Sequence, residues 1–129
     1  MPALSLTLHD SEIAAVDHQH DAITLRFAAA RVAWVDDAGQ RLQGFCTGLG
    51  LSLTGAALVQ RAGTPFGRIT HAELLLDARP LATLPSPGEW QGDVRLRLHG
   101  SDHWALDLTA GRFATTLAPG STLHEAMAC

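Results

Sequence analysis

VRLRLHGSDHWALDLTAGRFATTL, residues 94–117, is the stretch that decides the fold class of this chain. Apolar and polar residues alternate through most of it, which is the pattern of β-strands that bury one face and expose the other. A three-residue loop at 100–102 sets Leu98 opposite Trp104 and brings the remaining apolar residues of both strands onto one side. The stretch therefore predicts an antiparallel hairpin with a defined inner face.

The same register places Arg95 across from Asp107 on the outer face, as an opposite-charge pair. A second turn, of two residues at Ala110–Gly111, pairs Thr109 with Arg112 and adds a third strand with the same inner face. We therefore predict a three-strand meander in the C-terminal third of the chain.

Alternating runs recur elsewhere, at residues 4–8, 23–27, 49–53 and 68–76, and turn signals rich in Asp, Gly and Pro separate them. Strands of this length and spacing predict a single all-β domain over residues 1–129. We expect an antiparallel β-sandwich or barrel of about eight strands, and the sequence does not choose between the two.

Two local patterns modify this expectation. Phe27 and Val32 both suit the core but lie an odd number of residues apart, which predicts a bulge or tight bend at 28–30. In residues 122–125, Thr-Leu-His-Glu matches a capping box, which predicts a short C-terminal helix.

Composition excludes several classes of function. The chain carries 47% hydrophobic and 17% charged residues with a net charge of −4, and all its basic residues are arginine. A basic face for phosphates is missing, so we expect no nucleic-acid partner. No apolar run is long enough for a membrane helix, and the N-terminus lacks a secretory signal. With only Cys46 and Cys129, no disulfide framework is expected, and the chain is predicted to be a cytoplasmic bacterial protein.

The candidate catalytic and metal-binding motifs of the sequence are all incomplete. His18 and His20 share one side of a strand, but three or four converging ligands are needed and no further ligand follows at a suitable spacing. Cys46 has no histidine nearby in the sequence and suits the core better than a nucleophilic role. Ser52 stands in the middle of a strand, unlike the serine of a nucleophile elbow. We therefore predict no catalytic residue, no metal and no cofactor.

The tryptophans are candidates for binding. Trp34 and Trp104 fall on inner faces by alternation and are expected in the core. Trp90 opens a strand after a turn, so it is either a lid on the core or an exposed anchor for a partner.

The opening Leu8-His9-Asp10-Ser11, followed by a hairpin that ends Thr24-Leu25-Arg26-Phe27, resembles a group of small bacterial β-proteins that begin with an (L/F)HD(S/A) tetrapeptide. Some of that group are classed as immunity proteins, which neutralise the toxins of neighbouring cells. The resemblance implies a protein partner, with His9 and Asp10 as candidate binding residues. A structural reading stands beside it, in which the Asp10 carboxylate orients the imidazole or caps the next turn.

From these observations we expect a non-catalytic protein-binding module, similar to an immunity or adaptor protein. The alternative is a small-ligand-binding barrel with simple enzymatic chemistry, which needs a polar pocket inside the barrel. Residues 49–53 form a strand without guarding charges. Closure into a barrel, a central position or pairing with a second subunit would each protect it, and we expect a homodimer.

Overall fold

The computed structural model describes residues 1–126, in which it contains β-strands and no helix. The strands are β1 (Leu4–Gln19), β2 (Ala22–Val35), β3 (Arg41–Cys46), β4 (Leu49–Thr54), β5 (Ala57–Ala62), β6 (Gly67–Leu76), β7 (Arg79–Pro80), β8 (Leu84–Ser86), β9 (Gly88–Gly100), β10 (Ala105–Leu117) and β11 (Leu123–Glu125). The all-β prediction is confirmed. The described residues form eleven strands instead of about eight, because β7, β8 and β11 are too short for alternation to reveal them.

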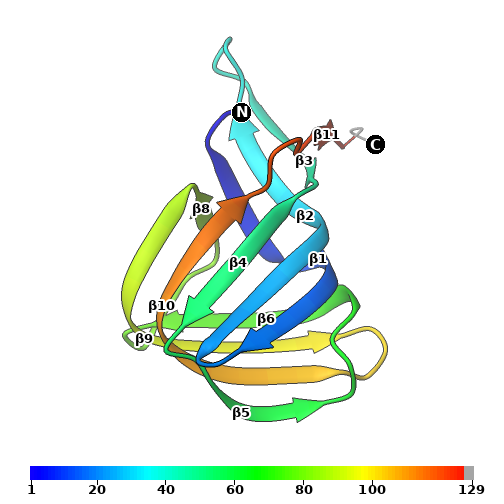
Figure 1. The fold of residues 1–129 in the computed structure, drawn as a ribbon. Coiled ribbons are helices and arrows are strands. Elements are labelled where there is room, and N and C mark those ends of the chain that lie inside the picture. The colour runs from blue at the N-terminus through cyan, green and yellow to red at the C-terminus, as the bar shows by residue number, and fades with distance from the viewer. Residues whose placement is uncertain (127–129) are drawn as a thin grey trace.

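Six strands close into an antiparallel barrel in the order β1–β2–β4–β10–β9–β6 (Figure 1). The return from β6 to β1 is a short seam at Glu12 and Ile13. The structure therefore selects a barrel over a sandwich. Residues 49–53 belong to β4, which is paired on both edges, by β2 and by β10. This strand needs no second subunit to protect it.

Beyond the barrel, β8, β3 and β11 extend the sheet beside the first part of β1 and the last part of β2 (Figure 1). The predicted helix at 122–125 is wrong, because Leu123–Glu125 is strand β11, paired with β3. The Thr122 hydroxyl lies 2.8 Å from that of Thr47 and so does not cap a helix. The local sequence favours a helix cap, but pairing with the free edge of β3 prevails. That edge is close to residues 123–125 only in the folded barrel.

The phase slip at 28–30 is confirmed. The register between β1 and β2 shifts next to Ala28, and Phe27 and Ala30 are both buried. In β6, Ala72 and Leu74 are at least partly buried, whereas Thr70, which shares their alternation in the sequence, is exposed. A register shift between residues 69 and 71 changes the phase of β6 there.

The inner face of the β9–β10 hairpin is as predicted, but its register is wrong by two residues. Leu98 lies opposite Leu106 instead of Trp104, and the connection closes with the Gly100 amide donating to the Trp104 carbonyl at 3.0 Å. A shift by two keeps every side chain on its face, so alternation alone cannot detect it. Arg95 still reaches Asp107, diagonally, with two hydrogen bonds of 2.7 and 2.8 Å.

The turn predicted at Ala110–Gly111 is also wrong. β10 runs through these residues without turning back, and Gly111 sits at an irregularity in its pairing with β9. A bulge and a two-residue turn both change the phase of the apolar pattern, so the sequence supports either. The three-strand meander is therefore a hairpin whose second strand continues and pairs with β4.

The core is one cluster of buried apolar side chains, with Trp104, Phe113, Leu96 and Leu106 among its fully buried members. Most of its members come from inward positions of the six barrel strands, while Cys46 lies in β3, Leu84 in β8 and Trp104 in the β9–β10 connection. No helix in residues 1–126 is long and apolar enough to cross a membrane.

Candidate functional site

The predicted pair His9–Asp10 lies in β1 where this strand leaves its regular pairing with β2. Asp10 has a φ of 70°, a left-handed conformation that aspartate tolerates better than most residues. Its carboxylate receives hydrogen bonds from Arg68 at 2.6 and 3.0 Å and from Arg31 at 3.1 Å. The hydrogen bond from Arg68 is the largest cause that lowers the pKa of Asp10 below its ordinary value.

Ser11, the next residue, stabilises the same irregular part of β1 from the buried side. Ser11 is fully buried, and its hydroxyl donates to the Thr7 carbonyl at 2.7 Å and accepts the Arg31 amide N–H at 2.8 Å. The hydroxyl therefore links two backbone groups across the irregularity. Backbone groups in such a position need a partner, and the short side chain of serine supplies one.

Asp10 thus connects three barrel strands: its own β1, β2 through Arg31 and β6 through Arg68. His9 Nδ1 lies 3.3 Å from the Asp10 carboxylate, and the imidazole is half exposed. This geometry supports the structural reading of the pair. The two arginine partners were not found from the sequence, because they lie 21 and 58 residues away and no local pattern points to them.

Trp90 is half-buried and packs against the core. Its ring stacks on Phe113 with centroids 4.5 Å apart and an interplanar angle of 17°. The tryptophan therefore covers the core at this point of β9. Of the two expected roles, this position corresponds to a lid on the core and not to an exposed anchor for a partner.

The remaining chemical candidates do not gather into a catalytic group. Cys46 is buried in the core, and this burial raises the pKa of its thiol, which disfavours the reactive thiolate. His71 and His99 form an edge-to-face pair with centroids 5.7 Å apart on neighbouring strands. Within residues 1–126 no three His, Cys, Asp or Glu side chains are arranged to hold a metal ion.

Large apolar side chains fill the barrel axis, and the buried polar residues among 1–126 are Ser11, Ser86 and Thr115. Thr115 donates its hydroxyl to the Pro85 carbonyl at 3.0 Å. The interior thus offers little polar chemistry to orient a ligand, and the candidate site lies on the outside of the barrel.

The most conspicuous outer feature is β5, residues 57–62, all six of which are exposed. The strand pairs with β10 alone, and Figure 1 shows it at the lower end of the molecule with no strand beyond it. Leu58 and Val59 are 39% and 53% exposed. Val59 is an extra residue in the pairing with β10, because Gln60 lies opposite Asp107 and Leu58 opposite Leu108. One edge of β5 is therefore open and partly apolar.

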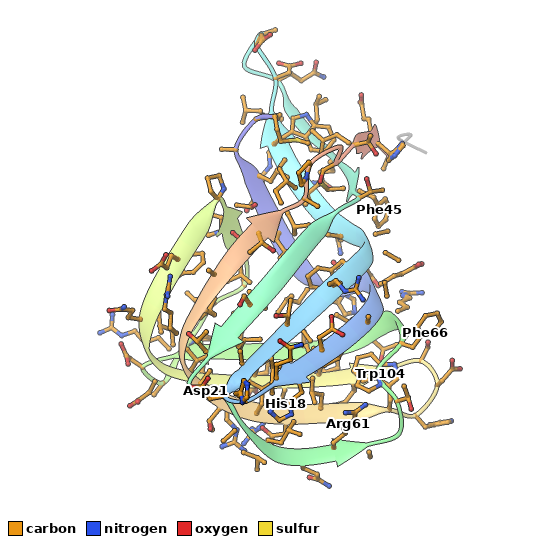
Figure 2. The ribbon with its side chains drawn as sticks, in the orientation of Figure 1. His18, Asp21, Phe45, Arg61, Phe66 and Trp104 are labelled. Carbon is orange, nitrogen blue, oxygen red and sulfur yellow. The ribbon has the colours of Figure 1, made fainter. Side chains whose placement is uncertain are left out.

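The charge on this strand comes from Arg61, which is exposed and is labelled in Figure 2. No Asp or Glu of residues 1–126 lies within 4 Å of its guanidinium. β5 itself contains no acidic residue. The sequence interpretation did not identify this strand, because Leu58 and Val59 are adjacent and break the alternation that revealed the others.

The candidate site is therefore an open strand edge with two exposed apolar side chains and one unpaired cation. Comparison with protein-family models, with curated proteins and with solved structures found no match to this chain.

Proposed function

We propose that the protein is a non-catalytic protein-binding module, of the immunity or adaptor kind, that binds an extended segment of another protein along β5. The observation that carries the proposal is the open edge of β5, whose six residues are all exposed. Unpaired N–H and C=O groups on such an edge accept an additional strand, and main-chain hydrogen bonds then provide the affinity.

The composition of the edge defines the partner. A carboxylate on the partner strand would form an ion pair with Arg61, and a second copy of β5 cannot supply one. The partner strand is therefore acidic, with small apolar residues to meet Leu58 and Val59. The bulge at Val59 and the charge of Arg61 restrict indiscriminate pairing, so the edge is selective.

An extended peptide of alternating valine and glutamate is a direct probe, with its valine–lysine counterpart as the comparison. We expect the glutamate peptide to protect the amides of residues 57–62 from hydrogen exchange and to bind at least tenfold more tightly than the lysine peptide. Arg61→Glu should reverse this preference. Arg79→Glu, the same change at another exposed arginine, should leave it unaltered.

Val59→Asp should weaken binding of the glutamate peptide by repulsion, whereas Val35→Asp, at a similarly exposed valine, should not. Equal binding of both peptides, or no protection in residues 57–62, would contradict the proposal. Light scattering of the protein alone provides the remaining test. A dimeric mass that Val59→Asp abolishes would identify a second copy as the occupant and overturn the choice of a foreign acidic strand.

A further inference from the structure

A small hollow lies on the outer face of the sheet formed by β8, β1, β2 and β3, at the opposite end of the molecule from β5 (Figure 1). Ser5 is paired with Pro85 on one side and with Ala33 on the other, and Ala33 is paired with Gln43. The methyl group of Ala33 is short, so the longer side chains around it enclose a space of about 170 Å³. Its lining residues are Ser5, Thr7, Arg31, Val32, Ala33, Arg41, Gln43 and Thr83.

This lining has an unusual charge for a protein with a net charge of −4. Two of its residues are arginines, four are neutral hydrogen-bonding residues, and none is acidic. Arg41 makes no ion pair within 4 Å among residues 1–126. The hollow therefore presents hydrogen-bond donors and positive charge together.

The second arginine, Arg31, is already oriented. One of its terminal nitrogens contacts Asp10 at 3.1 Å, while Arg68 makes two hydrogen bonds to the same carboxylate. One negative charge is thus shared by two guanidinium groups, so positive charge is left over. Asp10 fixes the position of Arg31 without neutralising the pair, which makes it a positioning residue for the hollow.

A second hollow of about 470 Å³ adjoins the first and shares Ser5, Ala33 and Arg41 with it. The rest of its lining is apolar: Ala3, Leu4, Trp34, Val35 and Pro85. Val35 is 57% exposed there, and Trp34 is half-buried. A cationic, donor-rich end thus continues into an apolar end.

We propose that these adjoining hollows bind a small organic anion, whose oxyanion group lies between Arg31 and Arg41 and whose apolar body lies along Val35 and Pro85. The planar fork of arginine matches the oxygens of carboxylates and phosphates, so either oxyanion suits the cationic end. The site is separate from the β5 edge and does not depend on it.

Calorimetric titration at constant ionic strength tests this site with three probes: inorganic phosphate, phenyl phosphate and benzoate. We expect both phenyl compounds to bind, and phenyl phosphate to bind at least fivefold more tightly than inorganic phosphate because its ring reaches the apolar end. Equal affinity of the two phosphates would assign the site to a free inorganic anion and overturn the role of Val35 and Pro85.

Arg41→Gln should weaken phenyl phosphate binding at least fivefold, whereas Arg79→Gln, at an exposed arginine on β7, should leave it unchanged. Ala33→Leu fills the hollow and should also abolish binding. Thermal melts of each variant establish that it is folded, and Arg41→Gln tests the proposal even if Ala33→Leu does not fold. Absence of binding in the millimolar range, or equal losses in Arg41→Gln and Arg79→Gln, would refute the proposal.

Discussion

Replacing Ser11 with alanine removes one buried oxygen and tests whether that atom holds the irregular part of β1. The hydroxyl donates to the Thr7 carbonyl at 2.7 Å and accepts the Arg31 amide N–H at 2.8 Å. Without it, both backbone groups lose this partner. A buried polar group left without a partner costs about 1–3 kcal/mol. Because these hydrogen bonds are only partly buried, we expect Ser11→Ala to lower the free energy of unfolding by about 2 kcal/mol.

Urea denaturation measures this loss directly, and the melting temperature should fall by about 5–10 °C in a chain of this size. Ser52→Ala is the matched control, since Ser52 is partly exposed on β4 and undergoes the same chemical change. Its effect should stay below about 0.5 kcal/mol. If the two variants lose the same stability, the hydroxyl of Ser11 does not hold the bulge, and the structural account of the His-Asp-Ser segment fails.

Three further predictions concern the barrel. Leu106→Ala empties a fully buried position and should cost about 2–5 kcal/mol in urea denaturation, so a loss below about 1 kcal/mol would contradict the assigned inner face. Hydrogen bonds from Arg95 lower the pKa of Asp107 below the unfolded value of about 3.9, so this residue stabilises the fold above that pH and its contribution is lost as the pH falls further. Asp107→Asn should therefore reduce the loss in the free energy of unfolding that occurs as the pH falls from about 7 to about 2. An unchanged pH dependence would argue against the Arg95–Asp107 ion pair. A Cβ added at Gly100 would overlap the indole ring of Trp104, so Gly100→Ala should destabilise by about 1–3 kcal/mol and alter the tryptophan fluorescence; an unchanged melt and spectrum would place the ring elsewhere.

The candidate β5 edge was not predictable from alternation. Leu58 and Val59 are adjacent, and all six residues of β5 are exposed, so no alternation of buried and exposed positions marks the strand. The cationic hollow was equally hidden, because Arg31 and Arg41 line the same hollow only through the pairing of β2 with β3. The sequence predicted Asp10 as a candidate residue, but its structural role depends on two arginines that are distant along the chain.

The sequence by itself determined the all-β class and which side chains face inward in residues 4–8, 23–27 and 49–53 and in the β9–β10 hairpin, because a period of two assigns each residue to a face whatever strand lies beside it. It did not determine the register of the β9–β10 hairpin, since a shift by two residues preserves every face. Nor did it separate a turn from a bulge at Ala110–Gly111, because both change the phase in the same way. Only the tertiary structure decided that the sheet closes and which edges stay open, because closure depends on contacts between residues far apart in the chain, such as the seam of β1 with β6.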